Sequence, residues 1–103
     1  MYFRLTADSV ELVDPQDTRS FSAVCPADLG VDDLAAIVER AGIGELLPGG
    51  GHLVVAVDAV RRMAAGRVGP GWPDDLAAML GYAASKGWTS EDGTRVRAHV
   101  ERR

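Results

Sequence analysis

Residues 2–13 read YFRLTADSVELV and set the class of the fold. Apolar and polar side chains alternate over residues 2–6 and, after a short polar break, over residues 10–13, with Phe3 and Leu5 on one face. An alternation with period two on both sides of a short break is typical of a β-hairpin. We therefore predict strands at residues 2–6 and 10–13.

A third strand is predicted over residues 19–24, after a proline-containing turn at residues 14–17. Its alternation places Phe21, Ala23 and Cys25 on one face. Because strands that follow one another along the chain usually lie side by side, we expect a three-stranded antiparallel meander. Cys25 is the only cysteine, so no disulfide within the chain can form, and we expect a buried, unreactive thiol.

The middle of the chain combines one helix with one buried strand. Apolar residues recur with the period of a helix over residues 32–41, and Gly42 suits a left-handed helix end. Residues 43–51 are rich in glycine and are predicted to form a loop. Residues 52–57 are rich in valine and predict a buried strand.

Three more helices are predicted in the second half. Asp58 is expected to cap a helix over residues 59–65, and a glycine-proline linker at residues 67–71 precedes a helix over residues 73–86. The capping-box pattern of residues 89–92 favours a last helix that runs to about residue 102.

Only Val96 and Val100 anchor the last predicted helix, so we expect it to be the least stable element. The chain is predicted to form one domain, residues 1–103, of class α+β and order βββαβααα. A small, mainly antiparallel sheet, composed of the three-stranded N-terminal meander plus one later strand, would be covered on one face by helices. If the third and fourth strands are parallel neighbours, the crossover between them should be right-handed.

The composition is that of an ordinary folded domain, with 103 residues, 47% hydrophobic and 25% charged. Apolar runs such as Leu53 to Val57 are far shorter than the roughly 20 residues of a membrane helix, and the amino terminus lacks a secretion signal. We therefore expect a cytoplasmic protein without a membrane partner. The net charge of -4 combines ten acids and three bases in residues 1–58 with eight bases and five acids in residues 59–103.

The helix, glycine turn and helix predicted between Asp74 and Arg102 invite comparison with a helix-turn-helix, and Ala83 and Gly87 have the spacing of its turn. The weak candidate residues for nucleic-acid binding are Arg95, Arg97, Arg102 and Arg103. Glu91 and Asp92 would lie at the start of the recognition helix, where their charge would oppose docking on phosphates. A nucleic-acid-associated regulator is therefore the alternative function and not the leading one.

No pattern of catalytic, cofactor-binding or metal-binding residues is present. Cys25, His52 and Asp58 are of the types that a nucleophile, base and orienting acid require, but nothing in their spacing supports such a triad. His52 and His99 form no helical pair of metal ligands, and the glycine loop 49–51 precedes a strand, where phosphate-binding loops follow one. We predict no catalytic residue, cofactor or metal. A small-molecule binder or enzyme that uses His52 and the glycine loop is a further alternative.

Aromatic residues give the main functional signal. Trp72, Tyr82 and Trp88 lie around one predicted helix, and tryptophan and tyrosine are favoured interface anchors. Trp88 follows the helix stop at Gly87 and is expected to fold back and be buried, whereas Trp72 is expected to stay exposed for recognition. The leading function is a non-enzymatic cytoplasmic accessory domain that binds a protein partner or associates with itself, for example as a homodimer.

The carboxyl-terminal third resembles other proteins. The segments WPDDL at residues 72–76, MLGYAASKGW at 79–88 and RAHVE at 97–101 resemble small uncharacterised actinobacterial proteins. This resemblance implies a bacterial origin and a shared carboxyl-terminal unit, and it transfers no functional residue.

Overall fold

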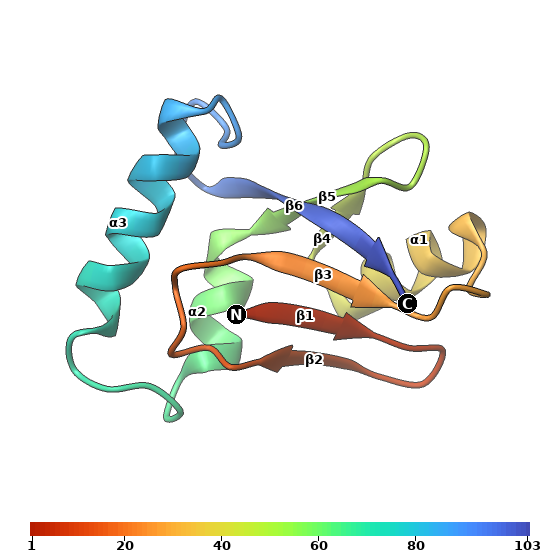
Figure 1. Ribbon diagram of the computed structural model, residues 1–103, viewed down its shortest axis with the longest axis horizontal. Coiled ribbons are helices and arrows are strands. Elements are labelled where there is room, and N and C mark those ends of the chain that lie inside the picture. Colours follow the sequence, from red (N-terminus) through yellow and green to blue (C-terminus); the bar gives the residue numbers. More distant parts are fainter.

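A computed structural model describes residues 1–103 and gives the element order βββαββααβ (Figure 1). The strands are β1 (Tyr2–Leu5), β2 (Val10–Val13), β3 (Ser22–Cys25), β4 (Gly44–Leu46), β5 (His52–Ala56) and β6 (Arg95–Arg102). The helices are α1 (Val31–Ala41), α2 (Val57–Ala64) and α3 (Trp72–Ser85). Three helices and a six-stranded sheet confirm the α+β class, but the predicted order βββαβααα is wrong.

The strands form one mixed, curled sheet in the order β2-β1-β3-β6-β5-β4. Strand β1 pairs antiparallel with β2 and parallel with β3. Strand β6 is parallel to β3 and antiparallel to β5, which is antiparallel to the edge strand β4. The predicted antiparallel meander is wrong. The chain between β2 and β3 passes the amino-terminal end of β1, so that β3 pairs with the edge of β1 opposite to β2. Because β6 separates β3 from β5, the expected crossover between parallel neighbours does not occur.

The largest departure from the sequence prediction is residues 95–102, which form β6 instead of a helix. Val96, Ala98 and Val100 are buried, while the residues between them are exposed. This alternation has period two. The helical prediction rested on Val96 and Val100, which are four residues apart and fit either period. Since β6 is paired along both edges, the expectation of a thinly anchored last element no longer applies.

The capping-box pattern at residues 89–92 caps no helix and instead forms the turn that leads into β6. The Asp92 carboxylate accepts hydrogen bonds from the hydroxyls of Ser90 and Thr94, both at 2.7 Å, and from the Thr94 backbone N–H at 3.1 Å. Gly93 completes the turn with a φ of 72°. The hydrogen bonds from Ser90 and then Thr94 lower the pKa of Asp92 to about 2, because they favour its charged form.

Strand β4 lies inside the predicted loop at residues 43–51. Gly44 makes this possible, because a Cβ there would lie 1.9 Å from the carbonyl oxygen of Val54 on β5. The turn from β4 to β5 is closed by hydrogen bonds from Leu47 N–H to the His52 carbonyl and from Gly50 N–H to the Leu47 carbonyl. The glycines therefore serve one close approach and one turn.

Each of the three observed helices corresponds to a predicted helix, and its first and last residues lie within two positions of the predicted ones. Helix α1 ends at Gly42, whose φ of 68° confirms the left-handed helix end. Helix α2 begins at Val57, so Asp58 lies in its first turn and does not cap it. Helix α3 begins at Trp72, with Pro73 in its first turn.

The core lies between the sheet and helices α1 and α2, which stand behind the sheet in Figure 1. One face of the strands supplies Phe3, Leu5, Leu12, Ala23, Cys25, Leu53, Val55, Val96, Ala98 and Val100. Helices α1 and α2 add Leu34 and Val60 among others, and no polar or charged residue is buried. At about 1.5–3 kcal/mol for each large side chain fully removed from water, this layer is the main source of stability.

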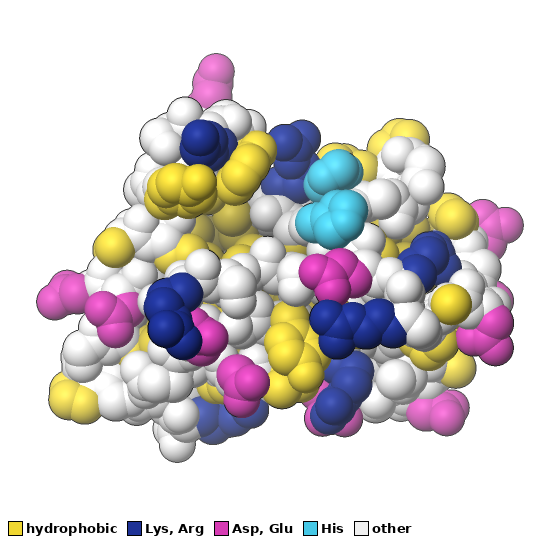
Figure 2. Space-filling view, viewed as in Figure 1, with side chains coloured by type: hydrophobic (Ala, Val, Ile, Leu, Met, Phe, Trp, Pro, Cys, Tyr) yellow, Lys and Arg dark blue, Asp and Glu magenta, His cyan; other side chains and the backbone are white.

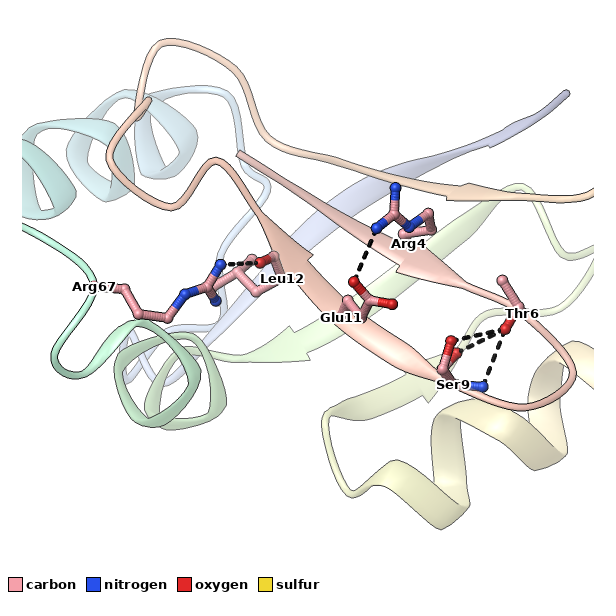
Figure 3. Close-up of polar contacts among 6 residues, drawn as sticks. All are labelled: Arg4, Thr6, Ser9, Glu11, Leu12 and Arg67. Carbon is pink, nitrogen blue, oxygen red and sulfur yellow. Dashed lines mark hydrogen bonds and ion pairs between the residues drawn. The ribbon is translucent and has the colours of Figure 1, made fainter.

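Polar contacts fix the β1–β2 hairpin and attach the next part of the chain to it (Figure 3). Arg4 and Glu11 lie opposite each other and form an ion pair with an N–O distance of 2.8 Å. The Thr6 hydroxyl accepts a hydrogen bond from the Ser9 backbone N–H at 3.0 Å. After α2, the Arg67 guanidinium donates to the Leu12 carbonyl at 2.8 Å. The linker to α3 is thereby held against the edge strand β2.

Helix α3 stands apart from the other two helices. Figure 1 shows it beside the ends at which β1, β3 and β6 begin, so that one face of the sheet remains uncovered. Its buried residues are Trp72, Leu76 and Ala83, while Met79 and Leu80 are half-buried. None of the three helices combines the length and the apolar composition that crossing a bilayer requires.

Candidate binding cleft

The face of the sheet turned away from α1 and α2 carries mainly polar side chains, and we call it the open face. Successive residues of a strand point to opposite faces, so β6 presents Arg97 and His99 on the open face while its valines enter the core. The register places His99 opposite His52 on β5 and opposite Ser22 on β3. Two histidines that are far apart in the sequence therefore become neighbours.

His52 and His99 form a cross-strand pair with ring centroids 5.4 Å apart and an interplanar angle of 66°. The neighbouring cross-strand pair is Gly51 and Val100, in which the Val100 N–H donates a hydrogen bond of 2.9 Å to the Gly51 carbonyl. The histidines therefore occupy a non-hydrogen-bonded position, where opposing side chains approach each other most closely. Both are exposed, so their ring nitrogens can reach a ligand on the open face.

Tyr82 and Trp88 form an aromatic wall opposite the histidines. Gly87 has a φ of 76° and turns the chain after α3, and the Trp88 N–H donates to the Ala83 carbonyl at 2.9 Å. The chain at Trp88 thus folds back onto the last turn of α3. The side chain, however, is 39% exposed instead of buried, and its ring lies edge-on to Tyr82, which is 61% exposed, at a centroid distance of 6.1 Å. Lys86 Nζ lies 5.6 Å from the Tyr82 ring centroid.

A cleft of about 890 Å³ separates the aromatic wall from the histidines. Figure 2 shows the two histidines at one side of a hollow and a group of hydrophobic side chains at the other. The residues that line the cleft are Thr18, Arg19, Ser20, Phe21, His52, Asp75, Ala78, Met79, Tyr82, Ala83, Trp88, Val96, Arg97 and His99. Half of these residues are hydrophobic, and the charged ones are two arginines and one aspartate.

Trp72 does not line the cleft, and the prediction that it is the exposed recognition residue is wrong. Its side chain is only 5% exposed, and its indole Nε1–H donates to the Pro15 carbonyl at 2.6 Å. Beside it, the Gln16 side-chain oxygen accepts the Gly69 N–H at 2.7 Å. Trp72 therefore fixes the start of α3 to the segment between β2 and β3, which is a structural role.

Of the four arginines proposed for nucleic-acid binding, Arg95 and Arg97 share the open face of β6, but three of the four are engaged by other groups. Arg95 forms an ion pair at 3.8 Å with Glu45 on the edge strand β4, and Arg103 forms an ion pair with Glu101. Arg102 donates to the Leu29 carbonyl. Arg97 alone among them has a side chain with neither an ion pair nor a hydrogen bond, and it lines the cleft. The basic helix edge and the helix-turn-helix on which that alternative depended are absent.

The residues considered for catalysis lie apart. Cys25 faces the core, where burial raises the pKa of its thiol, while Asp58 is exposed on α2. Of the three, only His52 lines the cleft, and no residue of the glycine loop 49–51 lines it. No group of three or more histidine, cysteine, aspartate or glutamate side chains is arranged to hold a metal ion.

Sequence reasoning missed the pairing of His52 with His99 and the contribution of Phe21 and Met79 to the cleft. The signal for the histidine pair was the alternation of Val96, Ala98 and Val100, which would have placed His99 on a strand and on its polar face. The identity of its neighbour depends on the register with β5, which no local pattern contains. The chain matches no family model, no curated protein and no solved structure.

Proposed function

We propose that the protein is a non-enzymatic binding domain that holds a segment of a partner protein in the cleft between α3 and the open face. The observation that carries this proposal is the exposed pair Tyr82 and Trp88, at 61% and 39% exposure. Aromatic side chains gain most when a partner removes them from water, and tyrosine and tryptophan dominate the energetics of interfaces. Their position at the rim of an apolar hollow suits an anchor contact.

The absence of a catalytic arrangement supports a non-enzymatic role. The interior contains no buried polar or charged residue. Catalytic acids and bases are usually held in place by burial and by close hydrogen-bonding partners, whereas His52 and His99 are both exposed. The cleft therefore offers surfaces for binding without a group that is positioned to react.

A small organic ligand is the second candidate, because the cleft volume of about 890 Å³ falls in the range of small-molecule sites. The peptide segment is preferred since the cleft is open along one side (Figure 2) and both residues of its aromatic wall, Tyr82 and Trp88, stay exposed. Small-molecule sites, by contrast, usually enclose most of the ligand surface.

The test is selection of binding peptides from a random dodecapeptide display library on the intact domain, with parallel selection on a Tyr82→Ser/Trp88→Ser variant. We expect enriched peptides on the wild type only. Val31→Ser is the matched control, because Val31 is a 44% exposed hydrophobic residue on α1, and it should leave the selection unchanged. Enrichment that survives the double substitution would place binding elsewhere and refute the proposal.

Two further measurements test whether the cleft instead binds a second copy of the chain or a small molecule. Sedimentation over a range of protein concentrations would reveal a dimer, and a dimer lost in Tyr82→Ser/Trp88→Ser would identify a second copy of the chain as the partner. A melting-temperature increase with a small compound, together with no peptide enrichment, would favour the small-molecule function.

A further inference from the structure

The charge balance of the cleft differs from that of the whole chain. The protein has a net charge of -4 with its histidines counted as neutral, whereas the charged residues that line the cleft are Arg19, Arg97 and one acid, Asp75. Arg19 is engaged by Asp17 at 3.1 Å. Arg97 has no ion-pair partner and leaves its guanidinium free for a ligand.

The free guanidinium and the histidine pair are spaced along one strand. Arg97 and His99 are separated by one residue on β6 and share the open face, so their Cα atoms lie about 7 Å apart. Side chains at alternate positions of an extended peptide repeat at the same spacing of about 7 Å. A peptide laid along β6 could thus direct one acidic side chain to Arg97 and the next-but-one to the imidazoles of His99 and His52.

The apolar part of the cleft adds an anchor beside these charges. The backbone N–H of Arg97 donates to the Trp88 carbonyl at 2.8 Å, which holds the start of β6 against the aromatic wall. Phe21 and Met79 contribute to the same hollow. A ligand that reaches Arg97 therefore also meets an apolar surface.

Resting on the proposed function, we infer that the partner segment is acidic and extended, with two carboxylates separated by one residue and a hydrophobic side chain next to them. Arginine binds carboxylates through charge-assisted, often bidentate, hydrogen bonds, and imidazole N–H groups donate to them as well. A single-stranded nucleic acid is disfavoured, because its affinity grows with the number of phosphates neutralised, and Arg97 is the one unpaired arginine in the cleft.

The display selection tests this inference through the sequences that are enriched. We expect two aspartates or glutamates separated by one residue beside an aromatic or aliphatic residue. Enriched peptides that depend on Tyr82 and Trp88 but are neutral or basic would overturn this inference and leave the proposed function intact. An absence of peptides that depend on the cleft would instead refute the proposed function.

Titration of an enriched, end-blocked peptide gives the quantitative test. Replacement of its two acidic residues by glutamine or asparagine should weaken binding by about tenfold or more, and Arg97→Gln should do the same. Arg62→Gln removes an equal charge from the exposed face of α2, outside the cleft, and should change the affinity less than about twofold. Equal losses in both variants would show a general charge effect and overturn the inference.

Two more arms identify the ligand class. Arg97→Glu should bind a copy of the peptide with lysine at the paired position better than the acidic original, because the favourable ion pair is restored with opposite signs. A single-stranded oligothymidylate should fail to displace the acidic peptide. Displacement at low salt that disappears at high salt would indicate a nucleic acid as the occupant and refute the acidic-peptide assignment.

Discussion

The two ends of α3 carry the same residue type in opposite environments. Trp72 at the first turn is 5% exposed and hydrogen-bonded to Pro15, whereas Trp88 beyond the last turn is 39% exposed and contacts Tyr82 edge-on. Trp72 is followed four residues later by buried Leu76, so both point to the same inward side of the helix. Gly87 directs the chain away before Trp88, which leaves that indole at the cleft. Position relative to the helix end, and not residue type, determines which tryptophan is buried and which stays exposed at the cleft.

The largest effect is expected for Trp72→Ala. Truncation of a buried tryptophan typically costs about 3–5 kcal/mol of unfolding free energy, which is a large part of the stability of a small domain. Equilibrium urea denaturation measures it. A loss no greater than that of Trp88→Ala would remove the contrast between the two ends of α3.

A smaller loss is expected for Trp72→Phe, which keeps an aromatic ring but removes the indole donor. The Pro15 carbonyl then loses its 2.6 Å hydrogen bond, and an unpaired buried acceptor costs about 1–3 kcal/mol. The same denaturation series measures this variant. If Trp72→Phe were as stable as the wild type, packing alone would explain the anchoring of α3.

Trp88→Ala should cost less, about 0.5–1.5 kcal/mol, which is the usual value of an aromatic pair contact. Its main effect should fall on binding in the cleft, and Tyr82→Ala should behave alike because each ring contacts the other. Denaturation together with peptide titration separates the two effects. A variant that is strongly destabilised yet binds normally would mean that Trp88 is structural after all.

The smallest effect is expected for Asp92, in the turn that joins α3 to β6. Because the pKa of Asp92 in the folded protein is about 2, below its ordinary value of 3.8, its carboxylate stabilises the fold above about pH 4. This stabilisation is lost as the pH falls from about 4 towards about 2. Asp92→Asn should lower the stability at neutral pH and weaken the pH dependence in this window. Glu91→Gln, at an exposed neighbouring position, is the control, and equal curves for both variants would contradict the role of Asp92.

The elements that were predicted correctly are those whose signal is local. The hairpin of β1 and β2 and the helix α1 each carry a clear period and an end signal, such as Gly42. Strand β6 was missed because two valines four residues apart satisfy both helical and strand periods, and alanine at position 98 is a weak core signal. The turn residues before it imitate a helix cap, since the same serine and aspartate chemistry serves turns and caps.

The arrangement of the sheet could not be predicted, because it is set by partners that are distant in sequence. Strand β3 lies parallel to β1 and β6 although the predicted turn at residues 14–17 forms, closed by the hydrogen bond from Asp17 N–H to the Asp14 carbonyl. The turn gives no sign that residues 18–21 then carry the chain to the far side of β1. The cleft could not be predicted for the same reason, because its two sides come from segments that are distant in sequence. Tyr82 and Trp88 were identified from composition, but their opposite wall required the register of His52 with His99.

The central position of β6 has a consequence for how the chain reaches its fold. The strand formed last in the chain joins two partial sheets, β2-β1-β3 and β5-β4, along both of its edges. Until residues 95–102 are available, the edges of β3 and β5 remain unpaired templates for other strands. Such a non-local closure is slow compared with helix formation and exposes intermediates to aggregation. Shortening the chain by its last strand should therefore abolish folding and not merely trim the molecule.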